Sequence, residues 1–378
     1  MTTIHQLSQL TLDFVNDPST GPEDRTLLQR ALLARPAFQP VTDALPADEA
    51  IRRLDLARRI ELQHQATIPN ATPPPCLNAF QLAVLCIIPM AALEETAARV
   101  TRGNLALEEY FSSVETFVRI FLLTSHPDAP PVNLGHGQCR NRDGNRCIFL
   151  GTADPDACHV FPFAATSSNA RAIRLRRLWN IVHAVIGDRA IVVSSGRPGG
   201  RDKAWNMLCL NPQLHRWWGQ ARFGLKCLGV QPDAAGTAIV SIQFVWMAKQ
   251  TGAADAWSQE LRIDAGDGDA WVAQQRSRPP YGTPGDGHDN EHDRYNHNGI
   301  VAAVHAQIGR PLRSGSMAFV VLPSLSDALD MKAVLDVQWA CISLASMSGA
   351  AGSDDFLDAD EFDDTCRWSV LTRDAQRE

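Results

Sequence analysis

A cysteine stands directly before a histidine in the stretch "DPDACHVFPF", which covers residues 154–163. The imidazole of His159 ionises near neutral pH, so it can transfer a proton or bind a metal ion. The thiol of Cys158 can be a soft metal ligand or a small buried hydrophobic group. The pair therefore has three interpretations: a buried pair on a strand, half of a metal site, or a catalytic base beside a position where a ligand has been replaced.

Two further polar residues follow in a set order. Asn206 lies in a predicted loop, and His215 comes nine residues later in "NMLCLNPQLH". This order of His, Asn and His, with the spacing of nine, resembles the HNH endonuclease motif of the ββα-metal fold. The segments "RCIFLG", "ACHVFPF", "NMLCLNPQLHRWWGQARF" and "LDVQWACISLASMSGAA" resemble fungal HNH-like domains more closely still. The resemblance covers residues 139–229 well and extends weakly to about residue 352.

The resemblance implies a role for each of the three residues. His159 would be the general base that takes a proton from the attacking water. Asn206 would hold the imidazole in its orientation, and His215 would bind a divalent metal that neutralises charge on the scissile phosphate. It also implies that a helix presents His215 to the β-hairpin that carries His159.

Two positions depart from the pattern of the family. The residue before the base is commonly Asp or His, but here it is Cys158, which suits zinc better than Mg²⁺. The residue four after the last histidine is often His or Asp, but here it is Gly219, which has no side-chain donor. His215 and Cys158 are thus the candidate ligands of a divalent metal, Mg or Zn, in a site with fewer ligands than a nuclease usually has.

The same block contains other residues that zinc prefers. A mixed Cys/His tetrahedral site is chemically sensible for zinc, and the candidates are Cys139, Cys147, Cys158, Cys209 and His215. Their spacings match no common zinc module. The alternative is that these cysteines are small buried hydrophobic residues.

The block is also basic in an otherwise acidic chain. Residues 139–229 contain fourteen Lys and Arg against five Asp, whereas the whole chain has a net charge of −7. This asymmetry favours an anionic partner, although basic residues spread over solvated surfaces are the alternative. A predicted basic helix carries four candidate phosphate contacts, which are Arg171, Arg174, Arg176 and Arg177.

Patterning along the chain predicts an α+β fold. Apolar residues at three- and four-residue spacing indicate a helical N-terminal region at 1–125, and a segment rich in Pro and Gly at 126–138 indicates a linker. The HNH-like domain is predicted at 139–352, with strands added to a ββα core. Within it, residues 264–298 are predicted to form a mobile loop because they are poor in apolar residues. The acidic tail at 353–378 is predicted to be disordered.

Two apolar segments predict helices. The run "CLNAFQLAVLCIIPMAAL" is interrupted by Asn, Gln and Pro, which favours a buried helix over a membrane span. The segment "LSDALDMKAVLDVQWACISLASMSG" predicts a long C-terminal helix that ends at Gly349. No basic segment followed by an apolar one begins the chain, and nine cysteines form no disulfide pattern. We therefore expect an intracellular protein, cytoplasmic or nuclear, with reduced thiols and no signal peptide.

Three functions fit these patterns. The first is metal-dependent hydrolysis of nucleic-acid phosphodiesters. The second is an HNH-like scaffold that acts on a small molecule, as a cyclase or isomerase of fungal specialised metabolism, with His159 as an acid or base in an apolar pocket. The third is an inactive module that binds nucleic acid. The predicted partner is therefore a nucleic acid or a small-molecule substrate and not a membrane.

Overall fold

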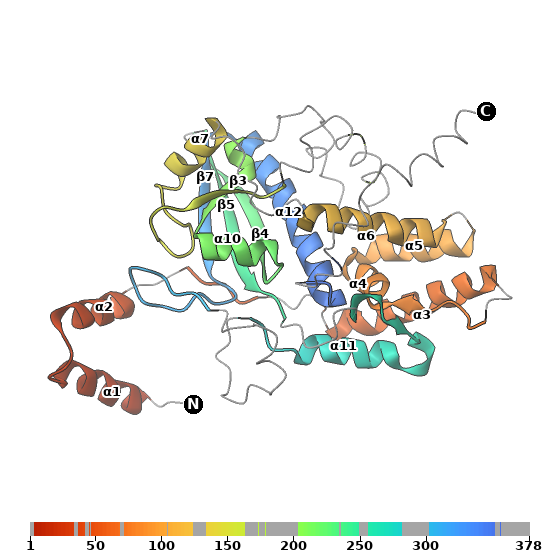
Figure 1. Cartoon of the computed structure of the whole chain (residues 1–378), viewed down its shortest axis with the longest axis horizontal. Helices are drawn as coiled ribbons and strands as arrows, with labels where there is room; N and C mark the ends of the chain where they lie inside the picture. Colours follow the sequence, from red (N-terminus) through yellow and green to blue (C-terminus); the bar gives the residue numbers. More distant parts are fainter. Residues whose placement is uncertain are drawn as a thin grey trace.

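The computed structural model describes most of the chain in segments. They are residues 4–33, 37–41, 45, 47–68, 72–103, 105–123, 134–162, 173, 178, 203–233, 236–248, 256–281, 302–351 and 356. Within these segments helices combine with small antiparallel sheets, which confirms the predicted α+β class. The helices of residues 47–123 lie at one end of the molecule, and the strands of the largest sheet lie toward the other (Figure 1).

The N-terminal helices follow the predicted periodicity. The helical end consists of α3 (Ala47–Thr67), α4 (Ala79–Ile87), α5 (Met90–Thr101) and α6 (Leu107–Leu123). Helix α4 begins with a capping box, in which the side chains of Asn78 and Gln81 each bond to the backbone N–H of the other. Seven of its nine residues are buried. The most apolar run of the sequence is thus part of the core, and no helix in the described segments is long and apolar enough to cross a membrane.

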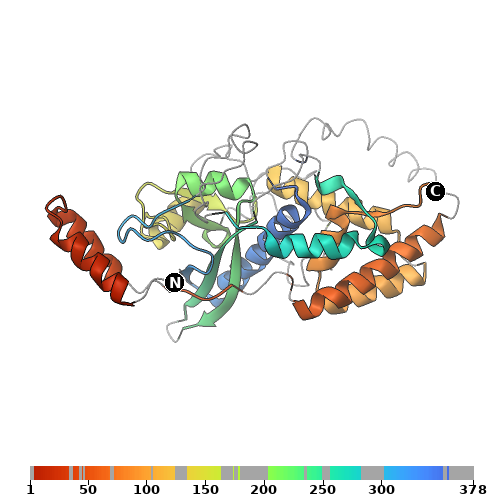
Figure 2. The same cartoon turned by 90° about the horizontal axis from the view of Figure 1, so that it is seen from below.

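Two helices precede this region as a projecting arm. Helices α1 (Ile4–Asn16) and α2 (Pro22–Leu33) extend away from the rest of the molecule in both views (Figures 1 and 2). The chain after the arm returns to the sheet, where Phe38 forms an isolated bridge with Ser316.

The largest sheet has the strand order β4 (Phe223–Pro232), β5 (Ala238–Trp246) and β7 (Met317–Leu322), and all its pairings are antiparallel. Its inner face packs against helix α12 (Leu325–Ser348). The approach is close at Gly224, where a Cβ atom would lie 3.0 Å from the Trp339 ring. The side-chain oxygen of Gln338 accepts a hydrogen bond from the backbone N–H of Leu225 at 3.1 Å, which ties the helix to β4.

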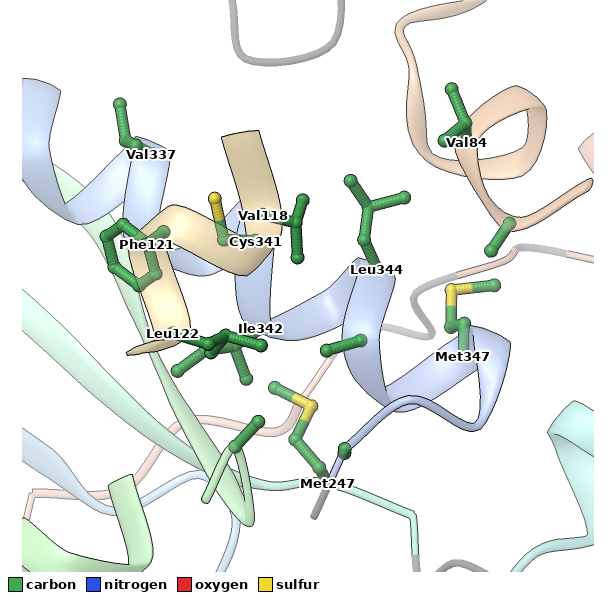
Figure 3. Close-up of a cluster of buried hydrophobic side chains, with 14 of the residues drawn as sticks. Val84, Val118, Phe121, Leu122, Met247, Val337, Cys341, Ile342, Leu344 and Met347 are labelled. Carbon is green, nitrogen blue, oxygen red and sulfur yellow. The ribbon is translucent and has the colours of Figure 1, made fainter. Parts of the chain in front are cut away.

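Helix α12 joins the two ends of the molecule in one core. Its first half covers the sheet and its second half contacts α4 and α6. Figure 3 shows Cys341 and Leu344 of α12 beside Val118 of α6, with Val84 of α4 nearby. The helix ends as predicted at Gly349, whose φ of 94° is accessible to glycine at little cost. One buried cluster therefore spans the N-terminal helices and the sheet.

Three parts of the chain differ from the predicted boundaries. Residues 267–277 of the predicted mobile loop form helix α11, because Trp271 and Val272 bury one face of it in the core. Helix α7 (Leu134–Arg142) begins inside the predicted linker. Phe356, in the predicted disordered tail, is fully buried with its ring 5.2 Å from that of Trp257. The remainder of the loop, residues 282–298, and the rest of the tail lie outside the described residues.

Candidate active site

A short hairpin carries the residues of the HNH-like motif. Strand β2 (Asp156–His159) pairs antiparallel with β3 (Met207–Leu210), and His159 lies opposite Met207. Helix α10 (Pro212–Gly219) follows β3 directly. Asn211 starts this helix, because its side-chain oxygen accepts a hydrogen bond from the N–H of Gln213 at 2.9 Å and Pro212 needs no N–H partner. The segment "RCIFLG", one of those that resemble HNH-like domains, is mostly a turn.

Asn206 is a fully buried residue just before β3. Its side-chain oxygen accepts a bond from the N–H of Phe161, and its amide nitrogen donates one to the carbonyl of Phe161, each at 2.9 Å. Its backbone carbonyl also accepts from the N–H of Val160 at 2.8 Å. These bonds fix the backbone immediately after His159.

His215 forms a pair that the sequence prediction missed. Its Nδ1 atom lies 3.1 Å from Oδ2 of Asp156, the first residue of β2. The side chain of His215 is 16% exposed and that of Asp156 is 45% exposed, so solvent reaches the pair. The sequence contained one signal for this pair. Side chains alternate along a strand, so Asp156 lies on the same face as Cys158, the residue that we predicted as a ligand.

His159 points to the other face of the hairpin. Asp156 and His159 are three residues apart on one strand, so their side chains leave opposite faces. The ring of His159 lies 5.4 Å from that of His136 on α7, at an interplanar angle of 80°. The structure therefore brings His159 together with His136, which the sequence did not indicate, and not with His215.

Cys158 is 1% exposed and belongs to the main hydrophobic cluster. Burial raises the pKa of its thiol well above the ordinary value. Its sulfur donates a hydrogen bond to the backbone carbonyl of Asp156 at 3.4 Å. Cys158 therefore lies inside this cluster and not at the partly exposed pair of Asp156 and His215. Gly219, the other departure from the motif, is buried at the end of α10.

A second polar cluster lies between α7 and β3. The sulfur atoms of Cys139 and Cys209 are 3.7 Å apart, and a carboxylate oxygen of Asp143 lies 3.7 Å from the sulfur of Cys139. The guanidinium of Arg142 donates to Asp143, to the Met207 carbonyl and to the sulfur of Cys139. The hydrogen bond to Cys209, together with burial, raises the pKa of Cys139 far above its usual range. Of the predicted zinc candidates, only Cys139 and Cys209 have ligand atoms in this cluster.

The hairpin and α10 lie within a segment that matches a known protein family. Residues 147–226 match the family described as HNH endonuclease. This HNH-like domain contains β2, β3 and α10, together with the start of β4. The match suggests a nuclease-like function and carries no information on the predicted fungal origin. Comparisons with curated proteins and with solved structures gave no match.

The four predicted phosphate contacts of the HNH-like domain, Arg171, Arg174, Arg176 and Arg177, lie outside the described residues. Their role stays a prediction.

Proposed function

We propose that the HNH-like domain hydrolyses phosphodiester bonds of nucleic acid with a divalent metal ion, and that Asp156 and His215 form the working site. The observation that carries this proposal is the distance of 3.1 Å between Asp156 Oδ2 and His215 Nδ1 within the matched residues. The hairpin and α10 correspond in our proposal to the ββα core of the family. The basic charge of residues 139–229 supports an anionic substrate.

The donor atoms at this site fit a divalent cation. Neighbouring ligands of an octahedral ion with bonds of about 2.1 Å lie about 3.0 Å apart, close to the separation of this carboxylate oxygen and this imidazole nitrogen. The pair is partly exposed, so water and substrate phosphate can complete the coordination. When bound, the ion would neutralise charge on the phosphate.

Each residue of the motif has a defined task in this proposal. Asp156 and His215 hold the ion, and Asp156 takes the place that the sequence gave to Cys158, whose side chain belongs to the main hydrophobic cluster. Asn206 fixes the turn of the chain after β2 through its bonds to Phe161. We assign no step at this site to His159, because its ring is directed at His136 across the hairpin. Its predicted role as base is tested separately.

The small-molecule alternative predicts an enclosed pocket at His159. A cavity among the described residues lies elsewhere, between α3 and α5. That cavity has a volume of about 360 Å³ and is lined by Arg52, Asp55, Arg59 and Glu94 among others. It is bordered by helices outside the match to the HNH family.

The test is a cleavage assay of the full chain on plasmid DNA and on single-stranded RNA, with Mg²⁺, Mn²⁺ and Zn²⁺ titrated separately. We expect cleavage that requires one of these ions and is lost in His215→Ala and in Asp156→Ala. His159→Ala is the comparison: retained cleavage supports a site at Asp156 and His215, whereas complete loss restores His159 as base. The proposal fails if neither substrate is cut at any ion concentration, or if His215→Ala cuts as well as the wild type.

A further inference from the structure

A second cluster of metal-ligand side chains lies across the hairpin from Asp156 and His215. Asp143 directly follows the last residue of α7, and its backbone N–H donates to the carbonyl of Cys139 at 3.0 Å, so the two side chains lie one helical turn apart on the same face. Cys209 of β3 faces them. The ligand atoms of all three residues lie within 4.8 Å of one another. Both cysteines are fully buried.

We propose that Cys139, Cys209 and Asp143 bind a structural zinc ion that joins helix α7 to strand β3. The separation of the sulfur atoms fits this proposal. Two thiolates that share a tetrahedral zinc ion at the usual bond length of about 2.3 Å lie about 3.8 Å apart. The sulfur atoms of Cys139 and Cys209 are 3.7 Å apart without an ion. The carboxylate oxygen of Asp143 is also 3.7 Å from Cys139, as a third ligand requires.

The charges of the cluster balance with zinc as they do without it. In the metal-free form the cluster holds two neutral thiols, the Asp143 carboxylate and the Arg142 guanidinium. Zinc would replace the two thiol protons, and its two positive charges would offset the two thiolates. Arg142 can remain in place, because two of its hydrogen bonds go to the backbone carbonyls of Ala204 and Met207. Its N–H group 3.4 Å from Cys139 would then donate to a zinc-bound thiolate.

The three side chains leave one position of a tetrahedral zinc ion, which water can occupy. A Cys₂-Asp set is hard to detect in the sequence, because Cys139 and Cys209 are 70 residues apart and belong to no short spacing motif. The ion would pin α7 against the hairpin and so fix the side of the HNH-like domain opposite Asp156 and His215.

The first test is elemental analysis of the purified full chain after exhaustive dialysis. We expect about one zinc per chain, and loss of that zinc in Cys139→Ala and in Cys209→Ala. Cys341→Ala is the matched control, because Cys341 is equally buried but lies on α12 away from the cluster. It should retain the zinc. Asp143→Asn should weaken zinc binding while leaving a side chain of the same shape.

The second test works even if the cysteine variants fail to fold. Cobalt is added to metal-free wild-type protein, and a thiolate-to-cobalt charge-transfer band in the near ultraviolet is expected, since Cys139 and Cys209 would be its ligands. The Asp156–His215 pair has no thiolate and gives no such band, so the result is independent of the proposed nuclease function. The proposal is overturned if dialysed wild-type protein holds no zinc and shows no band, or if folded Cys139→Ala and Cys209→Ala variants retain both.

Discussion

The imidazole of His215 and the carboxylate of Asp156 meet at 3.1 Å where α10 crosses the start of β2. They come from positions 59 residues apart in the sequence. Pro212 and the cap at Asn211 start α10 immediately after β3, so the helix holds His215 over the paired strand. The pairing of the two strands thereby assembles the proposed metal site.

The charge of the Asp156 carboxylate should strengthen binding of the divalent ion. Asp156→Asn keeps the size of the side chain but removes the charge of a direct ligand, so affinity for the divalent ion should fall by at least about 10- to 100-fold, the range found when a carboxylate that only supports a metal-binding histidine is lost. The measurement is the ion concentration that gives half-maximal cleavage. Asp154→Asn is the control, because Asp154 is exposed two residues earlier and its left-handed backbone suits Asn. Equal ion dependence of the two variants would contradict the prediction.

The buried amide of Asn206 provides a prediction on stability. In Asn206→Asp the carboxylate cannot donate to the Phe161 carbonyl, so this buried hydrogen bond is lost. Loss of one partner of a buried hydrogen bond costs about 1–3 kcal/mol of unfolding free energy, measured by chemical denaturation. The control is Asn211→Asp, the same chemical change at the start of α10, where Asp caps a helix as well as Asn does. A stability of Asn206→Asp equal to that of the control would show that the hydrogen bond donated to the Phe161 carbonyl does not matter.

The ion pair of Arg142 and Asp143 is buried, with side-chain exposures of 11% and 3%. Arg142→Met leaves the Asp143 carboxylate without its cation, and removal of one partner of a buried pair costs about 3–5 kcal/mol. Denaturation is measured with a zinc chelator present, so that only the ion pair is compared. Arg140→Met is the control on the same helix, since Arg140 is exposed.

The double variant Arg142→Met/Asp143→Leu separates the ion pair from the packing of Arg142. It should recover part of the lost stability, because no unpaired charge remains buried. If the double variant is less stable than Arg142→Met alone, the carboxylate is held by its other contacts and the prediction is wrong.

Tyr110 on α6 sets the alkaline limit of stability. Burial raises its pKa from 10.0 to about 12. The unfolded chain therefore releases this proton from about pH 10, before the folded chain does, and the free energy of unfolding should fall as the pH rises from about 10 to 12. Cys86, whose pKa burial raises from 9.0 to about 12, adds a loss that begins at lower pH.

Tyr110→Phe tests this effect by equilibrium denaturation at several pH values. The Tyr110 hydroxyl is buried with no hydrogen-bond partner among the residues that the structure describes, so at pH 7 the variant should be as stable as the wild type or more stable by about 1 kcal/mol. Above pH 10 its advantage should increase, while the loss due to Cys86 remains. An unchanged difference between the variant and the wild type from pH 7 to 11 would contradict the assignment.

Local patterns predicted the elements well where one face of an element is buried. The periodicity of residues 47–67 matches α3. Helix α12 begins after Ser324, whose side chain caps its first turn, and it ends at Gly349 as predicted. The composition of residues 267–277 predicted part of a mobile loop, and this prediction was wrong. Few apolar residues suffice there, because Trp271 and Val272 meet a core that other segments have already formed.

The sequence by itself determined the order and spacing of His159, Asn206 and His215, and with them the resemblance to HNH domains that the family match supports over residues 147–226. Only the tertiary structure decided which side chains meet. Side chains alternate along β2, so His159 faces α7 and Asp156 faces α10. The pairing of β2 with β3 places Cys209 beside Cys139. Spacing along the chain does not encode these neighbours, because strand register and helix packing are set by the burial of many residues at once.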